Sequence, residues 1–170
     1  LVQVAPRLAG VEWNIRFIGT VREDSTLTSL HGRGEVDDEM VWLAIRELYP
    51  GRWIPFLEKQ GDGPASSREI ALDLGIDTTL INKWVTEKGR EALTRHYTRS
   101  ARLDVNASPT LFINNIRADI EMTPQRLAMV LCARSGSNSP LCDSLPACIR
   151  DADCRKPGKI GRCIDRNGTR

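Results

Sequence analysis

The sequence of 170 residues lacks several features that mark common functional classes. All five cysteines lie in the last quarter and no stretch reads C-x-x-C, so no redox-active pair of that kind is present. The formal net charge of +2 gives no electrostatic reason to expect a nucleic-acid partner. No run approaches the roughly 18 apolar residues of a membrane-spanning helix. Two separate histidines, His31 and His96, do not predict a metal site, and no cofactor is expected.

The length fits one domain of ordinary size with a small appendage. The chain begins with Leu1 rather than Met, shows no signal peptide, and starts in a stretch that reads as part of a helix, Leu1–Ala9. We therefore expect a processed or truncated product.

A predicted β-hairpin is the most informative feature of the chain. Residues 107–120 read Ala-Ser-Pro-Thr-Leu-Phe-Ile-Asn-Asn-Ile-Arg-Ala-Asp-Ile. Thr110–Ile113 is a β-branched and aromatic run, and Asn114-Asn115 supplies two residues that tolerate positive φ before a second strand. Pro109 stands where a proline is tolerated, at the start of a strand. Taken alone, Pro109 need only mark the start of the strand, as prolines commonly do. The Ser108–Pro109 bond is nevertheless of the type that can be cis.

Helical patterns occupy much of the chain before this hairpin. Apolar spacing and capping residues predict helices over Val36–Leu48 and Arg52–Gln60, short helices capped by Ser66 and Asp77, and a longer helix from Thr86. Three tryptophans are expected in their shared core: Trp42, Trp53 and Trp84.

Three acidic residues open the first of these helices. Asp37, Asp38 and Glu39 suit the positive end of the helix dipole, and the alternative, a metal site, is less favoured. The apolar stripe of the helix is expected to be Val41, Ala44, Ile45 and Leu48.

A further strand is predicted near the N-terminus, over Val11–Ile18. Apolar residues alternate there with Glu12, Asn14 and Arg16, which is typical of a strand with one polar face at a sheet edge.

The order of helices, Ser-Pro, strand, turn, strand and then a helix opened by Thr123-Pro124 resembles the second half of a thioredoxin fold. The closer resemblance is to the DsbA-like branch, in which a helical domain is inserted between the two halves. It covers residues 1 to about 134. It is strongest at Thr28-Ser-Leu-His-Gly32, Glu35-Val-Asp-Asp-Glu39 and Ala107-Ser-Pro-Thr-Leu-Phe-Ile-Asn114.

The resemblance implies an α/β thioredoxin-like fold with a helical insertion at about residues 36–103. It also implies a cis-proline loop, Ser108, Pro109 and Thr110, that lines a groove for a protein or peptide substrate. The activity would be that of a thiol-disulfide oxidoreductase or isomerase whose first strand and C-x-x-C lie upstream of Leu1, so no residue of this chain is a catalytic candidate. The alternative is a non-catalytic binding or assembly subunit of an extracytoplasmic complex.

The C-terminal region is predicted to be a linker, residues 135–141, followed by a small cysteine-rich module, residues 142–170, that is itself incomplete. Few apolar residues are available there, so bridges of roughly 2–4 kcal/mol each would hold it. Zinc is the competing interpretation, but spacings of five and eight residues are wide for a zinc site. One cysteine is left over: either Cys132 is a buried free thiol or its partner lies in missing sequence. The disulfide candidates are Cys132, Cys142, Cys148, Cys154 and Cys163.

Overall fold

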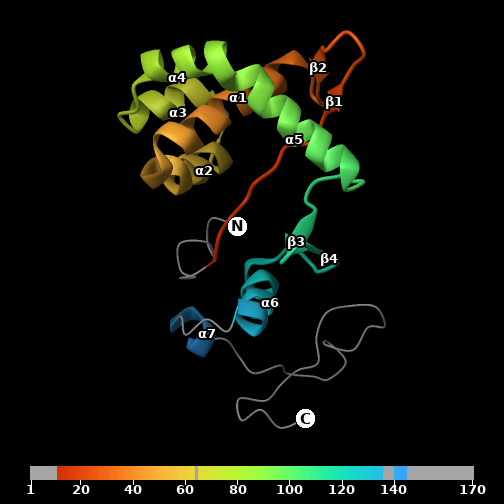
Figure 1. Ribbon diagram of the computed structural model, residues 1–170. Coiled ribbons are helices and arrows are strands. Elements are labelled where there is room, and N and C mark those ends of the chain that lie inside the picture. The colour runs from red at the N-terminus through yellow and green to blue at the C-terminus, as the bar shows by residue number, and fades with distance from the viewer. Residues whose placement is uncertain (1–10, 64, 136–139, 145–170) are drawn as a thin grey trace. The chain divides into compact units, whose positions relative to one another are not determined.

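The computed structural model describes residues 11–63, 65–135 and 140–144 (Figure 1). They divide into two compact units. The helical unit comprises residues 14–108 of the described chain, and the hairpin unit joins residues 11–13 to residues 109–135 and 140–144. Both contain helix and a small antiparallel sheet, so the chain is of mixed class. In the part of the chain described here, no helix is long and apolar enough to traverse a bilayer.

The helical unit consists of a short two-stranded ribbon followed by a series of helices. Strands β1 (Thr20–Val21) and β2 (Leu27–Thr28) pair antiparallel. The helices are α1 (Arg33–Leu48), η2 (Pro50–Arg52), α2 (Trp53–Gly61), α3 (Ser67–Asp73), α4 (Thr78–Trp84), the π-helical turn η3 (Val85–Gly89) and α5 (Arg90–Arg102). Helix α4 is followed by α5 through the intervening turn η3 (Figure 1).

Capping residues fix the start of the two short helices, as predicted. Ser66 and Glu69 form a reciprocal capping box at α3. At α4, the Asp77 carboxylate accepts a hydrogen bond from the Thr79 N–H at 2.8 Å. Gly75, with φ +67°, makes the turn between them, where a residue with a side chain would be strained.

Helix α1 begins at Arg33, three residues earlier than the prediction for Val36. Asp37, Asp38 and Glu39 therefore fall beyond the first turn, and their interpretation as dipole partners there is wrong. Glu39 instead faces the core, where it is 7% exposed. The predicted apolar stripe is confirmed at Val41, Ala44 and Ile45, which are fully buried, whereas Leu48 is exposed.

Aromatic side chains form much of the core of the helical unit. The Trp42 ring makes edge contacts with Phe17, Trp53 and Phe56, at centroid distances of 5.8, 6.2 and 5.8 Å. Trp53 and Trp84 are buried, and Trp42 packs half-buried against the same cluster. The prediction that these tryptophans are core residues is confirmed.

The strand predicted over Val11–Ile18 is absent: the structure assigns no strand to residues 11–19. Within the helical unit the alternation survives as alternating burial, with Ile15 and Phe17 inward and Asn14 and Arg16 outward. Helix side chains satisfy the backbone in place of a neighbouring strand. Ser100 Oγ donates to the Phe17 carbonyl at 2.7 Å, and Arg46 Nη1 donates to the Ile15 carbonyl at 3.2 Å. We call residues 14–18 the anchored segment.

The predicted hairpin is confirmed in the second unit. Strand β3 (Leu111–Ile113) pairs antiparallel with β4 (Ile116–Ala118), with Ile113 opposite Ile116. Asn114 and Asn115 form the turn with φ of 50° and 65°, which is why two residues tolerant of positive φ are needed.

Two helices complete the described part of the hairpin unit, α6 (Pro124–Ser135) and α7 (Pro140–Ser144). The Thr123 hydroxyl accepts from the Arg126 N–H at 3.3 Å and caps α6 as predicted. The core of the unit consists of Ile113, Ala118, Leu127, Ala128, Leu131 and Leu141, with Val11 and Trp13 packed against it.

A disulfide joins the two helices of this unit. Cys132 on α6 is bonded to Cys142 on α7, with the Cα atoms 5.5 Å apart. The expectation that Cys132 is a free thiol or pairs outside the chain is therefore wrong. Its partner is Cys142, ten residues later in the sequence, which α7 places next to α6. The remaining candidates, Cys148, Cys154 and Cys163, lie outside the described residues, as do the predicted module over residues 145–170 and the helix over Leu1–Ala9.

Replacing Gly19 by alanine should destabilise the helical unit by roughly 1–3 kcal/mol, the usual range for overpacking a core. A Cβ at this position would lie 2.3 Å from the ring of Tyr97 and 2.7 Å from the Thr28 carbonyl oxygen, and Tyr97 is fully buried. Urea denaturation measures the effect. The matched control is Gly34→Ala on α1, where a Cβ has no neighbour within 4 Å and helix propensity favours alanine by about 1 kcal/mol. Equal effects from both variants would contradict the tight packing at Gly19.

Replacing Cys132 by serine should lower the stability of the hairpin unit by about 2–3 kcal/mol, since a bridge over ten residues constrains the unfolded chain. The variants Cys142→Ser and Cys132→Ser/Cys142→Ser should lose the same amount, because any of the three removes one bond. Hydrogen exchange of α6 amides measures the loss. Additive losses in the double variant would show that the two cysteines act separately.

Candidate functional site

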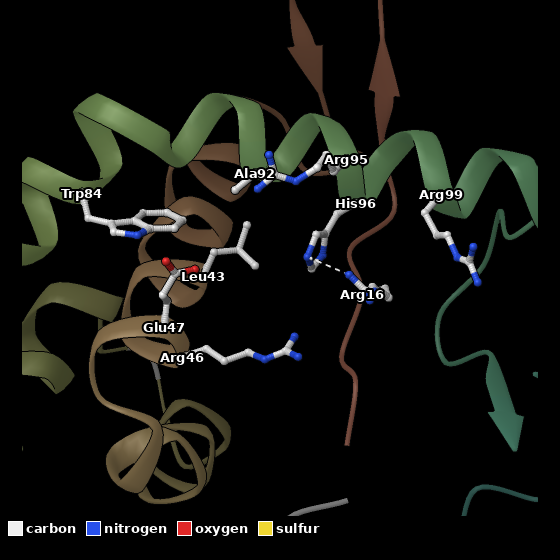
Figure 2. A pocket seen from close by; sticks show the side chains of 9 residues that line it. All are labelled: Arg16, Leu43, Arg46, Glu47, Trp84, Ala92, Arg95, His96 and Arg99. Carbon is white, nitrogen blue, oxygen red and sulfur yellow. Dashed lines mark hydrogen bonds between the residues drawn. The ribbon is translucent and has the colours of Figure 1, made fainter. Parts of the chain in front are cut away.

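A pocket of about 450 Å³ lies in the helical unit between the anchored segment, α1, α4 and α5 (Figure 2). It is lined by Arg16, Leu43, Arg46, Glu47, Trp84, Ala92, Arg95, His96 and Arg99. The four α5 residues are spaced i, i+3, i+4 and i+7, and the three α1 residues i, i+3 and i+4. This spacing places each set on one face of its helix.

His96 forms part of the pocket wall and is 7% exposed. Arg16 reaches from the anchored segment, and its Nη1 lies 3.3 Å from His96 Nε2 (Figure 2). A guanidinium can only donate, so Nε2 accepts, and the proton of the neutral ring is on Nδ1. The Phe17 ring stacks on the imidazole at 5.4 Å.

The protonated form of His96 is strongly disfavoured. Burial lowers the pKa of the imidazole to about 4, and the charges of Arg16, Arg46 and Arg95 act in the same direction. His96 is thus neutral near pH 7, and its Nδ1–H is a buried donor without a partner among the described residues.

The arginines of the pocket are held to different degrees. Arg46 donates to the Ile15 carbonyl and to Asn14 Oδ1, and Arg95 pairs with Glu91. Arg99 is exposed, and its side chain has no hydrogen-bond or ion-pair partner among the described residues. The arrangement can bind an anion, because guanidinium groups offer several donors in a fixed plane.

A second buried polar pair joins α1 and α5. The Tyr97 hydroxyl donates to Glu39 Oε2 at 2.5 Å, and both residues are buried. Burial raises the pKa of the Glu39 carboxyl to about 7; the Tyr97 hydrogen bond opposes this and the charge of Glu35 adds to it. The pKa of Tyr97 is raised as well, first by burial and then by Glu39.

The substrate-groove residues expected from the resemblance lie at the junction of the two units in the sequence. Ser108 is the last residue of the helical unit and Pro109 the first of the hairpin unit. Both are exposed, and Thr110 is half-buried directly before β3. Neither the pocket above nor a smaller one of about 260 Å³ beside β2 and α1 is lined by them.

The two histidines have separate environments. His31 pairs with Glu35 at 3.0 Å at the start of α1 and is exposed, so it is unrelated to the pocket around His96. The hydrogen bond to Glu35 raises the pKa of His31. In residues 11–63, 65–135 and 140–144, no three His, Cys, Asp or Glu side chains gather as a potential metal site.

Sequence reasoning missed the arginine pocket and Glu39. The signal for Glu39 was its helical phase, three residues after Val36 and four before Leu43, both of which are buried. The signal for the pocket was the recurrence of arginine on the face of α5 that also carries His96.

Comparisons with protein-family models, with curated proteins and with solved structures find no match to this chain. The likeness to DsbA-like proteins therefore depends on the sequence motifs named above.

Replacing Glu39 by glutamine should flatten the dependence of stability on pH. The folded carboxyl has its pKa raised to about 7, above its value in the unfolded chain. The folded state therefore binds more protons between these values, and wild-type stability falls as pH rises through about 7. Glutamine keeps an acceptor for Tyr97 and does not titrate.

Relative to wild type, Glu39→Gln should gain about 2 kcal/mol of unfolding free energy between pH 5 and pH 8, measured by urea denaturation at each pH. Glu58→Gln, at an exposed position of α2, is the matched control. A constant difference between Glu39→Gln and wild type across this range would contradict the raised pKa.

Proposed function

We propose that this chain is part of a thiol-disulfide oxidoreductase-type protein of thioredoxin-like fold, and that Ser108–Thr110 binds an extended segment of a protein substrate. The observation that carries the proposal is where the Ser-Pro motif stands in the chain. The helical unit ends at Ser108, and β3 begins two residues after Pro109 and turns back into β4. This is the order in which an inserted helical domain and a proline loop follow one another in the family that the sequence resembles.

The disulfide supports an extracytoplasmic location for this activity. Disulfides persist in oxidising compartments and are rare in the reducing cytosol. The bridge between Cys132 and Cys142 fastens α6 to α7, and a spacing of ten residues differs from the C-x-x-C of a redox-active pair. We therefore assign it a structural role.

In the proposed reaction, a thiolate of a C-x-x-C pair attacks one sulfur of a substrate disulfide. A mixed disulfide forms and the other substrate sulfur leaves as a thiolate. The second cysteine of the pair then attacks the mixed disulfide, so that the pair is oxidised and the substrate is reduced by two electrons. Residues 1–170 contain no C-x-x-C, so the pair would come from outside them, and the role of this chain is to position the substrate.

The backbone of the proline loop suits that role. An extended peptide gains affinity from main-chain hydrogen bonds to an exposed strand-like segment, and alternate side chains then give specificity. Ser108 and Pro109 are exposed, and proline fixes the backbone at its own position. The loop is therefore accessible and partly pre-organised for such pairing.

The second candidate function is a binding or assembly subunit without redox activity. The absence of cysteine from residues 1–131 favours it, because peptide binding by Ser108–Thr110 needs no thiol. The two functions share the same peptide site and differ in the presence of a reactive pair.

Peptide binding should be detectable in the 170-residue chain by NMR. An unfolded peptide with its cysteines alkylated should shift the backbone amide signals of Ala107, Ser108, Thr110 and Leu111, and Pro109→Ala should weaken binding about tenfold. Pro50→Ala, at an exposed proline opening η2, is the matched control and should bind like wild type. Equal affinity of all three proteins, or shifts confined to other residues, would overturn the assignment of the loop.

Insulin reduction separates the two candidate functions. The protein expressed from its complete coding region should reduce insulin if a C-x-x-C precedes the helical unit, whereas peptide binding without reduction supports the binding subunit. Reduction by the 170-residue chain itself would contradict both, because the proposal assigns it no reactive thiol.

A further inference from the structure

We propose that the pocket between the anchored segment, α1, α4 and α5 binds a small organic anion with carboxylate or phosphate groups. This inference is independent of the proposed oxidoreductase function, since every residue that lines the pocket belongs to the helical unit.

The polar groups of the pocket wall are almost all hydrogen-bond donors. Arg16, Arg46, Arg95 and Arg99 carry guanidinium groups, which have no acceptor atom. Two further N–H groups, His96 Nδ1 and Trp84 Nε1, are buried without a partner among the described residues. A buried donor without an acceptor costs about 1–3 kcal/mol, so a site with several donors and few acceptors favours a ligand rich in oxygen.

The charge of the pocket also favours an anion. The pocket lining contains four arginines and a single carboxylate, that of Glu47, and Arg95 is paired with Glu91 outside the lining. Glu47 lies 3.9 Å from Lys88, so its charge is shared with a cation outside the lining. Arg95 is compensated by Glu91 one turn earlier on α5, whereas the Arg99 side chain has no ion pair among the described residues. An anion in the pocket would balance the charge of Arg99.

His96 supports the arrangement as an uncharged member. Its Nε2 accepts from Arg16, which directs that guanidinium toward α5 (Figure 2). A neutral imidazole can hold Arg16 in place without adding repulsion, and a protonated one could not accept the hydrogen bond. His96 is therefore a positioning residue for Arg16.

The size and the apolar part of the pocket define the class of ligand. A volume of about 450 Å³ falls within the usual range of small-molecule sites, roughly 300–1,000 Å³. Leu43, Trp84 and Ala92 are buried apolar residues of the lining. The lining thus suits a short carbon chain or ring that carries two acidic groups, and bidentate contacts with guanidinium groups would orient those groups.

Titration of the 170-residue chain with succinate, followed by NMR, tests the proposal. The Trp84 indole N–H signal should shift with saturation in the millimolar range or below, and the Trp53 indole signal should not, because Trp53 does not line the pocket. Inorganic phosphate, titrated in parallel, shows whether phosphate is accepted in place of carboxylate. Succinamide, which has the same carbon chain without charge, should not bind.

Variants on α5 make the test specific. Arg99→Gln should weaken succinate binding about tenfold without affecting folding, because the Arg99 side chain is exposed and has no partner among the described residues. Arg102→Gln, three residues further along the helix and outside the lining, should stay within about twofold of wild type. If both variants weakened binding equally, the effect would reflect general charge attraction and not a specific contact of Arg99, and the proposal would be overturned. Binding of succinamide, or no binding of either anion, would overturn it as well.

Discussion

The attachment of Phe17 to α5 is the interaction on which the arrangement of the helical unit depends. Its carbonyl accepts the Ser100 hydroxyl in a buried hydrogen bond, and its ring lies against both His96 and Trp42. A buried carbonyl without a partner would cost about 1–3 kcal/mol, so Ser100 makes it possible to bury an extended segment that has no neighbouring strand. The same attachment sets the position of the adjacent Arg16, which is exposed and whose guanidinium reaches His96.

Two ionisable groups buried near the contacts between α1 and α5 respond to pH in opposite directions. Glu39 is easier to bury when protonated, and His96 is easier to bury when neutral, because in each case burial penalises the charged form. The pKa of His96 is lowered to about 4, so the unfolded state binds more protons below neutrality and stability falls as pH decreases toward 4. Both side chains are uncharged near pH 6, so the combined cost of burying their charged forms is smallest there.

Local chemistry was predictable from the sequence, and contacts between distant segments were not. Ser66, Asp77 and Thr123 revealed helix starts, and Asn114-Asn115 revealed the hairpin, because each acts within a few residues of itself. The period-2 pattern of the anchored segment also matches its alternating burial. Periodicity predicts which side chains are buried, but it does not predict which groups form hydrogen bonds with the backbone. Here the partners are Ser100 and Arg46, more than thirty residues away in the sequence, and Cys132 likewise needed a helix beyond the expected linker to meet Cys142.

The recurrence of arginine on α5 could not establish the pocket from the sequence alone, for a related reason. Arginine at Arg95 and Arg99 is compatible with an ordinary solvated face of a helix, and Arg16 with the polar side of a strand. They become one site because Phe17 fastens the anchored segment to α5 and thereby gathers cations from three elements around His96. The anchored segment therefore has two roles. The hydrogen bonds to its Ile15 and Phe17 carbonyls stabilise the segment, and they also fix the position of Arg16, which an anion in the pocket would contact. Because the Phe17 ring stacks on His96, the position of Phe17 also shapes the pocket, although Phe17 does not line it.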